Sequence, residues 1–257
     1  MTTTSMCRPS CGTDPSSPGL APVTVRVRRV TTTRAGGVSA PPFDTFNLGD
    51  HVGDDPAAVR ANRSRLASAV GLSEDRLVWM NQVHGDHVAL VEAPPPGPLE
   101  ATDALVTAAP RLALVVVTAD CVPVLMADAR AGVVGAAHAG RVGAAAGIAL
   151  RTLSAMVDAG ARVGDVSVLL GPCVSGPNYE VPEDMAADVE SRLPGSRTMT
   201  ARGTPALDLR AGLARQLAEA GVGAIDVDPR CTIADQGLFS HRRDGVTGRL
   251  ASLVWMQ

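Results

Sequence analysis

The chain has 257 residues, of which 46% are hydrophobic and only 2% aromatic, so it can bury a core built from Val, Leu, Ala and Ile. Its net charge of −3 at neutral pH argues against non-specific nucleic-acid binding. Because the sequence contains no Lys, Schiff-base catalysis and a Walker-type phosphate loop are excluded.

The cellular compartment is predicted from hydrophobic segments and from the cysteines. No apolar run approaches the length of a membrane span, and the first residues have no hydrophobic signal region. The five scattered cysteines are typical of a chain with reduced thiols, so a cytoplasmic location is expected. Residues 1–22 are rich in Thr, Ser, Pro and Gly and are predicted to form a disordered tail.

The first half of the remaining chain alternates between predicted strands and turns. Residues 23–33 alternate apolar and polar side chains, which indicates a half-exposed strand. A helix is expected from Pro56 to Gly71, capped by Asp54 or Asp55. Two strands at 76–80 and 87–93 then flank a bend. Four short β-branched segments follow as strands of a sheet covered on both faces, at 103–107, 111–120, 122–128 and 132–139.

The second half is expected to alternate helices and strands. A helix is predicted from about Val142 to Asp158, ending at Gly160, and a strand at 166–172 follows. Helices are expected near 183–193 and 208–220, and a strand at 249–256 closes the chain. Since no internal repeat or linker follows residue 22, residues 23–257 are predicted to form one mixed α/β domain.

Common catalytic patterns do not fit the five histidines: His51, His84, His87, His138 and His241. None forms H-E-x-x-H, and His138 begins His-Ala-Gly rather than the His-x-Glu of nucleobase deaminases. No G-x-S-x-G nucleophile motif is present. By default His51 and His87 are interpreted as polar surface positions near turns.

Three residues at predicted strand ends suggest a metal site. His84 lies at a bend, Cys121 follows a long apolar strand, and His138 ends another. Two imidazoles and one thiolate make a zinc set with an open fourth position, where zinc lowers the pKa of water from about 15.7 to about 7. Taken singly, each has a simpler interpretation: Cys121 as a small core residue, His138 as a hydrogen-bonded core histidine, and His84 as a solvated turn residue.

Anion binding is a second possibility. The small residues of 139–147 favour either an anion seat at a helix start or tight packing of helix against strand. Arg242 and Arg243 have the chemistry to bind phosphate in a bidentate manner, although such pairs are more often surface charge. The direction of Arg63 is left open.

The motifs, taken in order, resemble a known family. The segments that carry the resemblance are FNLGDHVGDDPAAVRANR (46–63), NQVHGDHV (81–88), TADCVPVLMAD (118–128), AAHAGRVGAAAGI (136–148), LLGPCVSGPNYEV (169–181) and FSHRRDGVTGRLASLV (239–254). The chain is similar to the YfiH-like family, also called the laccase-domain, polyphenol oxidase or peptidoglycan editing factor family. The resemblance implies a single-domain α/β sandwich of mixed β-sheets flanked by helices, with zinc bound by His84, Cys121 and His138.

The resemblance also implies an activity. Family members phosphorolyse adenosine, inosine, guanosine and methylthioadenosine, and deaminate adenosine. We therefore expect purine nucleosides and phosphate as ligands of a monomer or weak dimer. The side chains expected to contact substrate are Asn47, Arg63, Gln82, Arg242 and Arg243. Two positions depart from the family pattern, because Arg141 stands where many members have Trp and His241 replaces a Tyr.

Three other functions stay open. A copper polyphenol oxidase needs more imidazoles than five histidines supply. A hydrolase acting on cell-wall precursors would use Cys121 as nucleophile and His138 as base. A zinc-binding protein without catalysis is the third, because no general acid is obvious among Asp120, Asn47, Gln82 and Glu180.

Overall fold

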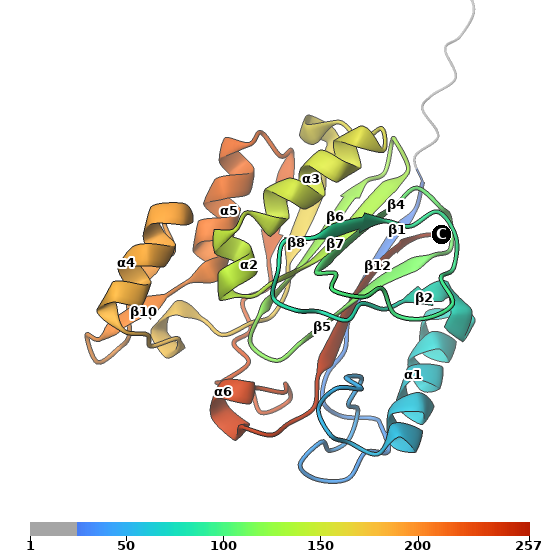
Figure 1. Cartoon of the computed structure of the whole chain (residues 1–257), viewed down its shortest axis with the longest axis horizontal. Coiled ribbons are helices and arrows are strands. Elements are labelled where there is room, and N and C mark those ends of the chain that lie inside the picture. Colours follow the sequence, from blue (N-terminus) through green and yellow to red (C-terminus); the bar gives the residue numbers. More distant parts are fainter. Residues whose placement is uncertain (1–24) are drawn as a thin grey trace, which may run out of the picture.

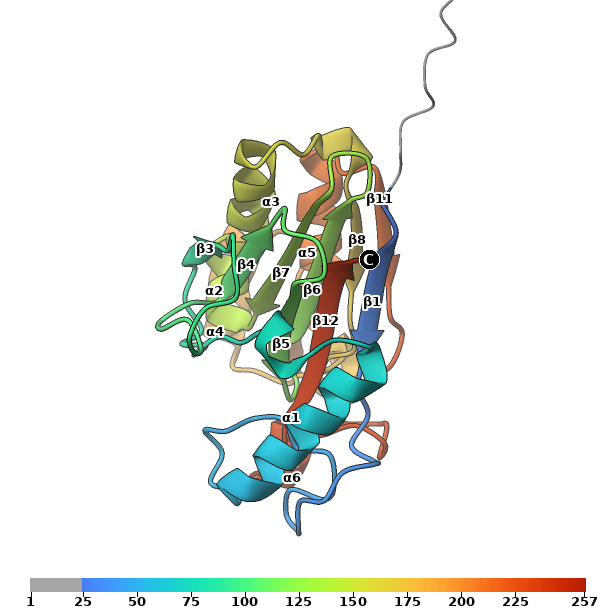
Figure 2. The same cartoon turned by 90° about the vertical axis from the view of Figure 1, so that its right-hand side faces the viewer.

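In a computed structural model that describes residues 25–257, two β-sheets pack face to face and helices cover their outer faces (Figure 1; Figure 2). The α/β sandwich of mixed sheets is therefore confirmed. The predicted N-terminal tail lies outside the described residues. Within residues 25–257, no helix is both long enough and apolar enough to cross a membrane.

The smaller sheet has four strands in the order β1-β12-β5-β2. They are β1 (Val27–Thr31), β12 (Leu250–Met256), β5 (Ala113–Thr118) and β2 (Leu77–Val78). Strand β12 is antiparallel to both of its neighbours, whereas β2 is parallel to β5. Helix α1 (Pro56–Val70) covers the outer face. It begins and ends as predicted, with the Asp55 side chain accepting from the Ala57 amide and Gly71 in the left-handed conformation at φ 72°.

The larger sheet has six strands in the order β11-β8-β6-β7-β4-β3. They are β11 (Ala224–Val227), β8 (Ser167–Leu170), β6 (Val122–Asp128), β7 (Val133–Ala139), β4 (Ala104–Thr107) and β3 (Val88–Leu90). The edge pairs β3–β4 and β11–β8 are parallel, and the central pairs are antiparallel. Strands β4, β6 and β7 are buried along their whole length, as their continuous apolar runs predicted.

Helices α3 (Ile148–Asp158) and α5 (Leu209–Glu219) cover the outer face of the larger sheet (Figure 1). The remaining elements are α4 (Glu183–Arg192), α6 (His241–Asp244), the hairpin β9 (Arg197–Met199) with β10 (Pro205–Leu207), and the 3₁₀ turns η1 (Glu74–Arg76), η2 (Val163–Asp165) and η3 (Gly176–Asn178). The core therefore has three layers of apolar contact: α1 against the smaller sheet, sheet against sheet, and α3 and α5 against the larger sheet. Helix α4 packs on α2 and on the β9–β10 hairpin.

The long helix predicted from Val142 to Asp158 is wrong. The segment forms a short helix, α2 (Arg141–Ala145), and then α3, with Gly147 at φ 84° between them. A left-handed residue cannot continue a right-handed helix. The sequence also gave no sign of β9, β10, β11 and α6, which have three or four residues each and lack a clear apolar period.

Candidate active site

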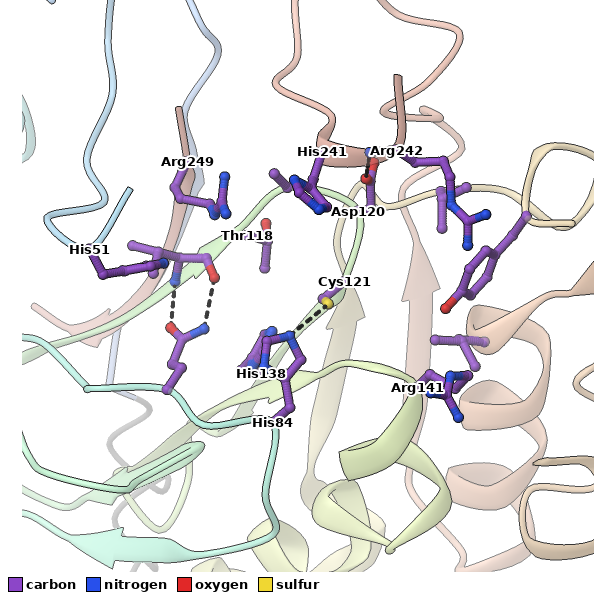
Figure 3. Close-up of a pocket in the computed structure, with 16 residues that line it drawn as sticks. His51, His84, Thr118, Asp120, Cys121, His138, Arg141, His241, Arg242 and Arg249 are labelled. Carbon is purple, nitrogen blue, oxygen red and sulfur yellow. Dashed lines mark hydrogen bonds between the residues drawn. The ribbon is translucent and has the colours of Figure 1, made fainter. Parts of the chain in front are cut away.

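His84, Cys121 and His138 meet at one end of the larger sheet (Figure 3). Cys121 immediately precedes β6, and pairing of β6 with β7 places Pro123 opposite His138. His84 reaches the same point from the loop between β2 and β3. The Cys121 Sγ lies 3.9 Å from the His84 Nε2, and the centroids of the two imidazole rings are 4.7 Å apart, edge to face. The convergence expected from the strand ends is therefore present.

These three side chains could hold one metal ion. Their ligand atoms all lie within 4.8 Å of one another. Around a tetrahedral zinc ion, the usual bond lengths place neighbouring nitrogen and sulfur ligands about 3.3–3.6 Å apart. Side-chain movements of about 1 Å would therefore bring the three donors onto a shared ion. Two imidazoles and one thiolate are also the donor chemistry that zinc prefers.

A buried carboxylate holds two of the ligands in place. Asp103 is fully buried, and its Oδ1 accepts from the His84 amide and lies 2.9 Å from the His138 Nδ1. Its Oδ2 accepts from the amides of Val83 and Gly85. This arrangement leaves the His138 Nε2 to face the cavity and fixes the loop that carries His84. The sequence reasoning did not single out Asp103, although an acidic residue directly before a buried strand is a usable signal.

Small residues beside the ligands serve packing. A Cβ added at Gly140 would lie 2.8 Å from the His84 Cδ2 and 3.1 Å from the Cys121 Sγ. A Cβ at Gly143 would lie 2.6 Å from the Gly85 carbonyl oxygen. Of the two alternatives for residues 139–147, the structure supports tight packing. The other alternative, an anion seat at the start of this helix, stays a prediction.

The thiol and the inner imidazole form a charged pair when no metal is bound. Burial opposes ionisation, but the charge and hydrogen bond of His138, with those of His84, lower the pKa of Cys121 to about 6. Burial likewise opposes charge on His138, yet the Cys121 thiolate and the Asp103 carboxylate raise its pKa to about 9. At neutral pH Cys121 is therefore a thiolate, the form that binds metals and attacks electrophiles.

The three residues line a cavity of about 330 Å³ whose walls are cationic. Arg141, Arg242 and Arg249 line it together with His51 and His241. Figure 3 shows His51 and Arg249 on one side and Arg141 and Arg242 on the other. The apolar lining is formed by Val117, Ala119, Val174, Leu209 and the ring of Tyr179. His51, interpreted from the sequence as an ordinary surface residue, is exposed but borders this cavity.

Two of the five expected substrate contacts line the cavity, Gln82 and Arg242. The Gln82 side chain is held by the backbone of Val117, with its Nε2 2.8 Å from the carbonyl oxygen and its Oε1 2.8 Å from the amide. The Arg242 guanidinium carbon lies 5.1 Å from the centre of the Tyr179 ring. These two residues remain candidates for substrate contact.

The other three are placed outside the cavity. Asn47 is fully buried and bonds to Gly49, Asp54 and the Arg249 amide. The Arg63 guanidinium donates to the Leu48 carbonyl, pairs with Asp50 and lies over the Trp79 ring. The Arg243 guanidinium pairs with Asp244 and donates to the carbonyls of Thr232, Ile233, Asp235 and Leu238. All three brace loops in this structure, and their contact with substrate stays a prediction.

Two of the candidate general acids, Asp120 and Glu180, are already hydrogen-bonded to or paired with other residues. The Asp120 carboxylate accepts from the hydroxyls of Thr232 and Ser240 and from the Arg242 amide. The Glu180 carboxylate pairs with Arg202 and borders a neighbouring groove. Asp120 lines the cavity and organises the turn that carries Arg242. The His51, Tyr179 and His241 side chains, which also line the cavity, are further candidates for the proton donor.

Comparison with known proteins places the chain in a family. Residues 28–257 match the model of the multi-copper polyphenol oxidoreductase laccase family. The chain is 71% identical over 235 residues to a purine nucleoside phosphorylase of Mycobacterium tuberculosis. This match covers 91% of this chain and 94% of the relative. A purine nucleoside phosphorylase of Corynebacterium glutamicum is 57% identical over 232 residues, covering 90% and 94%.

A solved structure agrees with this match. The hypothetical protein YfiH of Bacillus licheniformis superposes with a TM-score of 0.84 at 32% identity, covering 90% of this chain and 93% of that one. The fold, the matched motifs and the relatives all indicate the same family. The chain therefore belongs to the multi-copper polyphenol oxidoreductase laccase family, of which the YfiH-like proteins are structural neighbours.

Proposed function

We propose that this protein is a zinc-dependent purine nucleoside phosphorylase. The observation that carries the proposal is the set of His84, Cys121 and His138 at the floor of a cationic cavity. The names of the relatives from Mycobacterium tuberculosis and Corynebacterium glutamicum support the choice of substrate. Adenosine, inosine and guanosine are the proposed nucleosides, and inorganic phosphate is the co-substrate.

The reaction exchanges one bond for another at the ribose. A phosphate oxygen forms a bond to C1′ while the bond from C1′ to the purine nitrogen breaks, and the base leaves with a proton. The cationic walls suit the phosphate dianion, and the apolar residues Val117, Val174 and Leu209 suit the purine face. When bound, zinc supplies a Lewis acid and an acidified water. Asp103 keeps the His138 and His84 ligands oriented.

Two finer activities belong to the same proposal. Deamination of adenosine requires that water attack C6 of the purine ring and that the C6–N bond break with release of ammonia, for which a zinc site with an open position would be suited. Phosphorolysis of methylthioadenosine requires only that the cavity accept a thioether at the ribose 5′ position. Both would use the same three ligands, so both should be lost together with phosphorolysis when the metal is removed.

The test is a product analysis on zinc-loaded protein. Inosine with phosphate should yield hypoxanthine and ribose 1-phosphate, and omission of phosphate should abolish both products. Adenosine without phosphate should yield inosine if the deaminase activity is present. A zinc-loaded preparation that leaves all purine nucleosides intact would contradict the proposal.

A second candidate is a metal-independent hydrolase of cell-wall precursors, favoured by the Cys121 thiolate beside a protonated His138. Chelation separates the two, because a thiolate nucleophile survives metal removal and a zinc enzyme does not. Copper oxidation is disfavoured, since residues 25–257 offer one such ligand group and the chain has five histidines in all. Metal analysis of protein grown without added copper tests that point.

A further inference from the structure

The arginines near the cavity differ in how many of their guanidinium hydrogen-bond donors already have a partner in the protein. The Arg249 Nη1 donates to the carbonyls of Thr247 and Gly248, and Arg243 is bound by several carbonyls and Asp244. Arg141 is half-buried and lines the cavity. Among residues 25–257, no carboxylate pairs with Arg141, and the one side-chain partner of its guanidinium is the Tyr179 hydroxyl. A half-buried guanidinium of this kind indicates an anion supplied from outside the chain.

Two further donors lie on the same wall as Arg141. The Arg242 guanidinium has one long contact, 3.3 Å from its Nη1 to the Glu180 carbonyl oxygen, so most of its donors remain available. The Tyr179 side chain is half-buried, and this burial together with the charge of Cys121 raises the pKa of its phenol against the opposing influence of Arg141 and Arg242. The phenol therefore keeps its proton and can donate a hydrogen bond. Figure 3 shows Arg141 and Arg242 facing the cavity from the side away from His51 and Arg249.

The charges around the cavity favour a doubly charged ligand. On the proposed function, the site contains a divalent ion and the three guanidiniums of Arg141, Arg242 and Arg249. The thiolate of Cys121 and the carboxylates of Asp103 and Asp120 oppose them. Two positive charges are then left over, and a phosphate group at pH 7 carries about −1.5 to −2. A neutral nucleoside alone would leave them uncompensated in a half-enclosed cavity.

We propose that Arg141, Arg242 and the Tyr179 hydroxyl form a binding site for a phosphate dianion beside the three metal ligands. The planar fork of Arg141 can donate two parallel hydrogen bonds to two phosphate oxygens. Arg242 and the phenol donate from the same wall. This inference rests on the proposed function for the identity of the neighbouring ion. The phosphate is either inorganic phosphate or the 5′-phosphate of a nucleotide, because the chemistry recognised is the same.

The experiment measures binding of inorganic phosphate to zinc-loaded protein by titration calorimetry, and in parallel the KM for phosphate with saturating inosine. Arg141→Gln should raise both the Kd and the KM for phosphate at least about 10-fold, as expected when a charged bidentate contact is lost. The KM for inosine should stay within about 2-fold, and the zinc content should not change. Arg141→Lys should fall in between, because it keeps the charge but not the fork.

Two controls keep the result interpretable. Arg215→Gln removes one positive charge from an exposed pair on α5 and should leave phosphate binding unchanged. Tyr179→Phe keeps the ring and removes only the hydroxyl, so a weaker rise in the phosphate Kd, about 3-fold to 10-fold, is expected. Both variants, and Arg141→Gln, should unfold within a few degrees of the wild-type protein.

The source of the phosphate is decided by a second titration with inosine 5′-monophosphate. If Arg141→Gln weakens only inorganic phosphate, the site serves the co-substrate; if it weakens only the nucleotide, it serves a 5′-phosphate. Unchanged affinity for both ligands would overturn the inference even if phosphorolysis is intact. Conversely, Arg141-dependent phosphate binding without any nucleoside cleavage would support the site and contradict the proposed function.

Discussion

Two groups of polar residues in this protein differ in how many of their polar atoms have hydrogen-bond partners within the chain. Around Asn62, the side-chain amide donates to the Ser39 hydroxyl and to the carbonyls of Thr45 and Asn47, and its oxygen accepts from the Val38 amide. At the cavity floor, the ligand atoms of His84, Cys121 and His138 face one another. These atoms contact one another, through the 3.9 Å approach of the Cys121 Sγ to the His84 Nε2 and the hydrogen bond between Cys121 and His138.

The comparison separates residues that stabilise the fold from residues that are available to bind a ligand. Every polar atom of the Asn62 side chain has a protein partner, as buried polar groups need if they are not to destabilise the fold. The nitrogen and sulfur atoms of His84, Cys121 and His138, by contrast, lie close enough together to hold a metal ion. Asp103 joins the two kinds of site, because its carboxylate is fully bonded and yet holds two of the ligands. Substitutions in the two groups should therefore have separable effects.

The largest effect is expected from Cys121→Ser. Loss of the thiolate should lower zinc affinity and nucleoside turnover each by at least about 10³-fold, because a neutral hydroxyl is a poor zinc ligand. The unfolding free energy of the metal-free protein should change by less than about 1 kcal/mol. Competition with a chromogenic chelator measures the affinity. The matched control is Cys173→Ser, a fully buried thiol in the core, which should keep its zinc.

Asn62→Ala should have the opposite profile. It leaves the Val38 amide without its acceptor and removes one donor from each of three oxygens, of which the Thr45 carbonyl still accepts from the Ser39 amide. The unfolding free energy should therefore fall by about 2–4 kcal/mol. The zinc affinity should stay within about 2-fold. Urea unfolding of the metal-free protein gives the first number. A variant that lost zinc but kept its stability would break the distinction between the two groups.

Asp103→Asn tests the residue shared by both groups. The amide keeps the size of the side chain but can no longer accept at all of its present contacts, so zinc affinity should fall about 10-fold to 100-fold. Stability should fall as well, by about 1–3 kcal/mol, since buried amides of residues 83–85 lose an acceptor. Full zinc affinity in this variant would show that the carboxylate does not position His138.

The smallest effect is expected from Arg63→Gln. Because this guanidinium braces the Leu48 carbonyl and lies 3.9 Å over the Trp79 ring, its loss should lower the unfolding free energy by about 1 kcal/mol. The KM values for phosphate and inosine should not change. An increase in either KM would restore Arg63 to the substrate contacts that the sequence suggested.

Local signals explain what the sequence predicted well. The Asp55 cap, Pro56 and Gly71 of α1 act within a few residues of one another, and the strands of the larger sheet show as unbroken apolar runs. The candidate metal ligands His84, Cys121 and His138 were singled out because each lies near the end of a predicted strand and because the motifs resemble a family. The break at Gly147 was missed because an Ala-rich segment with Gly is compatible with one helix or two.

Long-range partners explain what the sequence did not predict. Asp103 meets His138 across 35 positions of the chain, and Arg63 meets Leu48 across 15. The sequence alone does not distinguish an arginine that braces a loop from an arginine that binds an anion. Arg141 and Arg63 are told apart only by whether a carbonyl or carboxylate of the folded chain already occupies their donors.

X-ray absorption at the zinc edge of the loaded protein measures the ligand set itself. A single zinc per chain with two imidazole nitrogens at about 2.0–2.1 Å, one sulfur at about 2.3 Å and one further light atom is the expected result. A first shell without sulfur, or with two or more sulfurs, would show that His84, Cys121 and His138 do not share the ion.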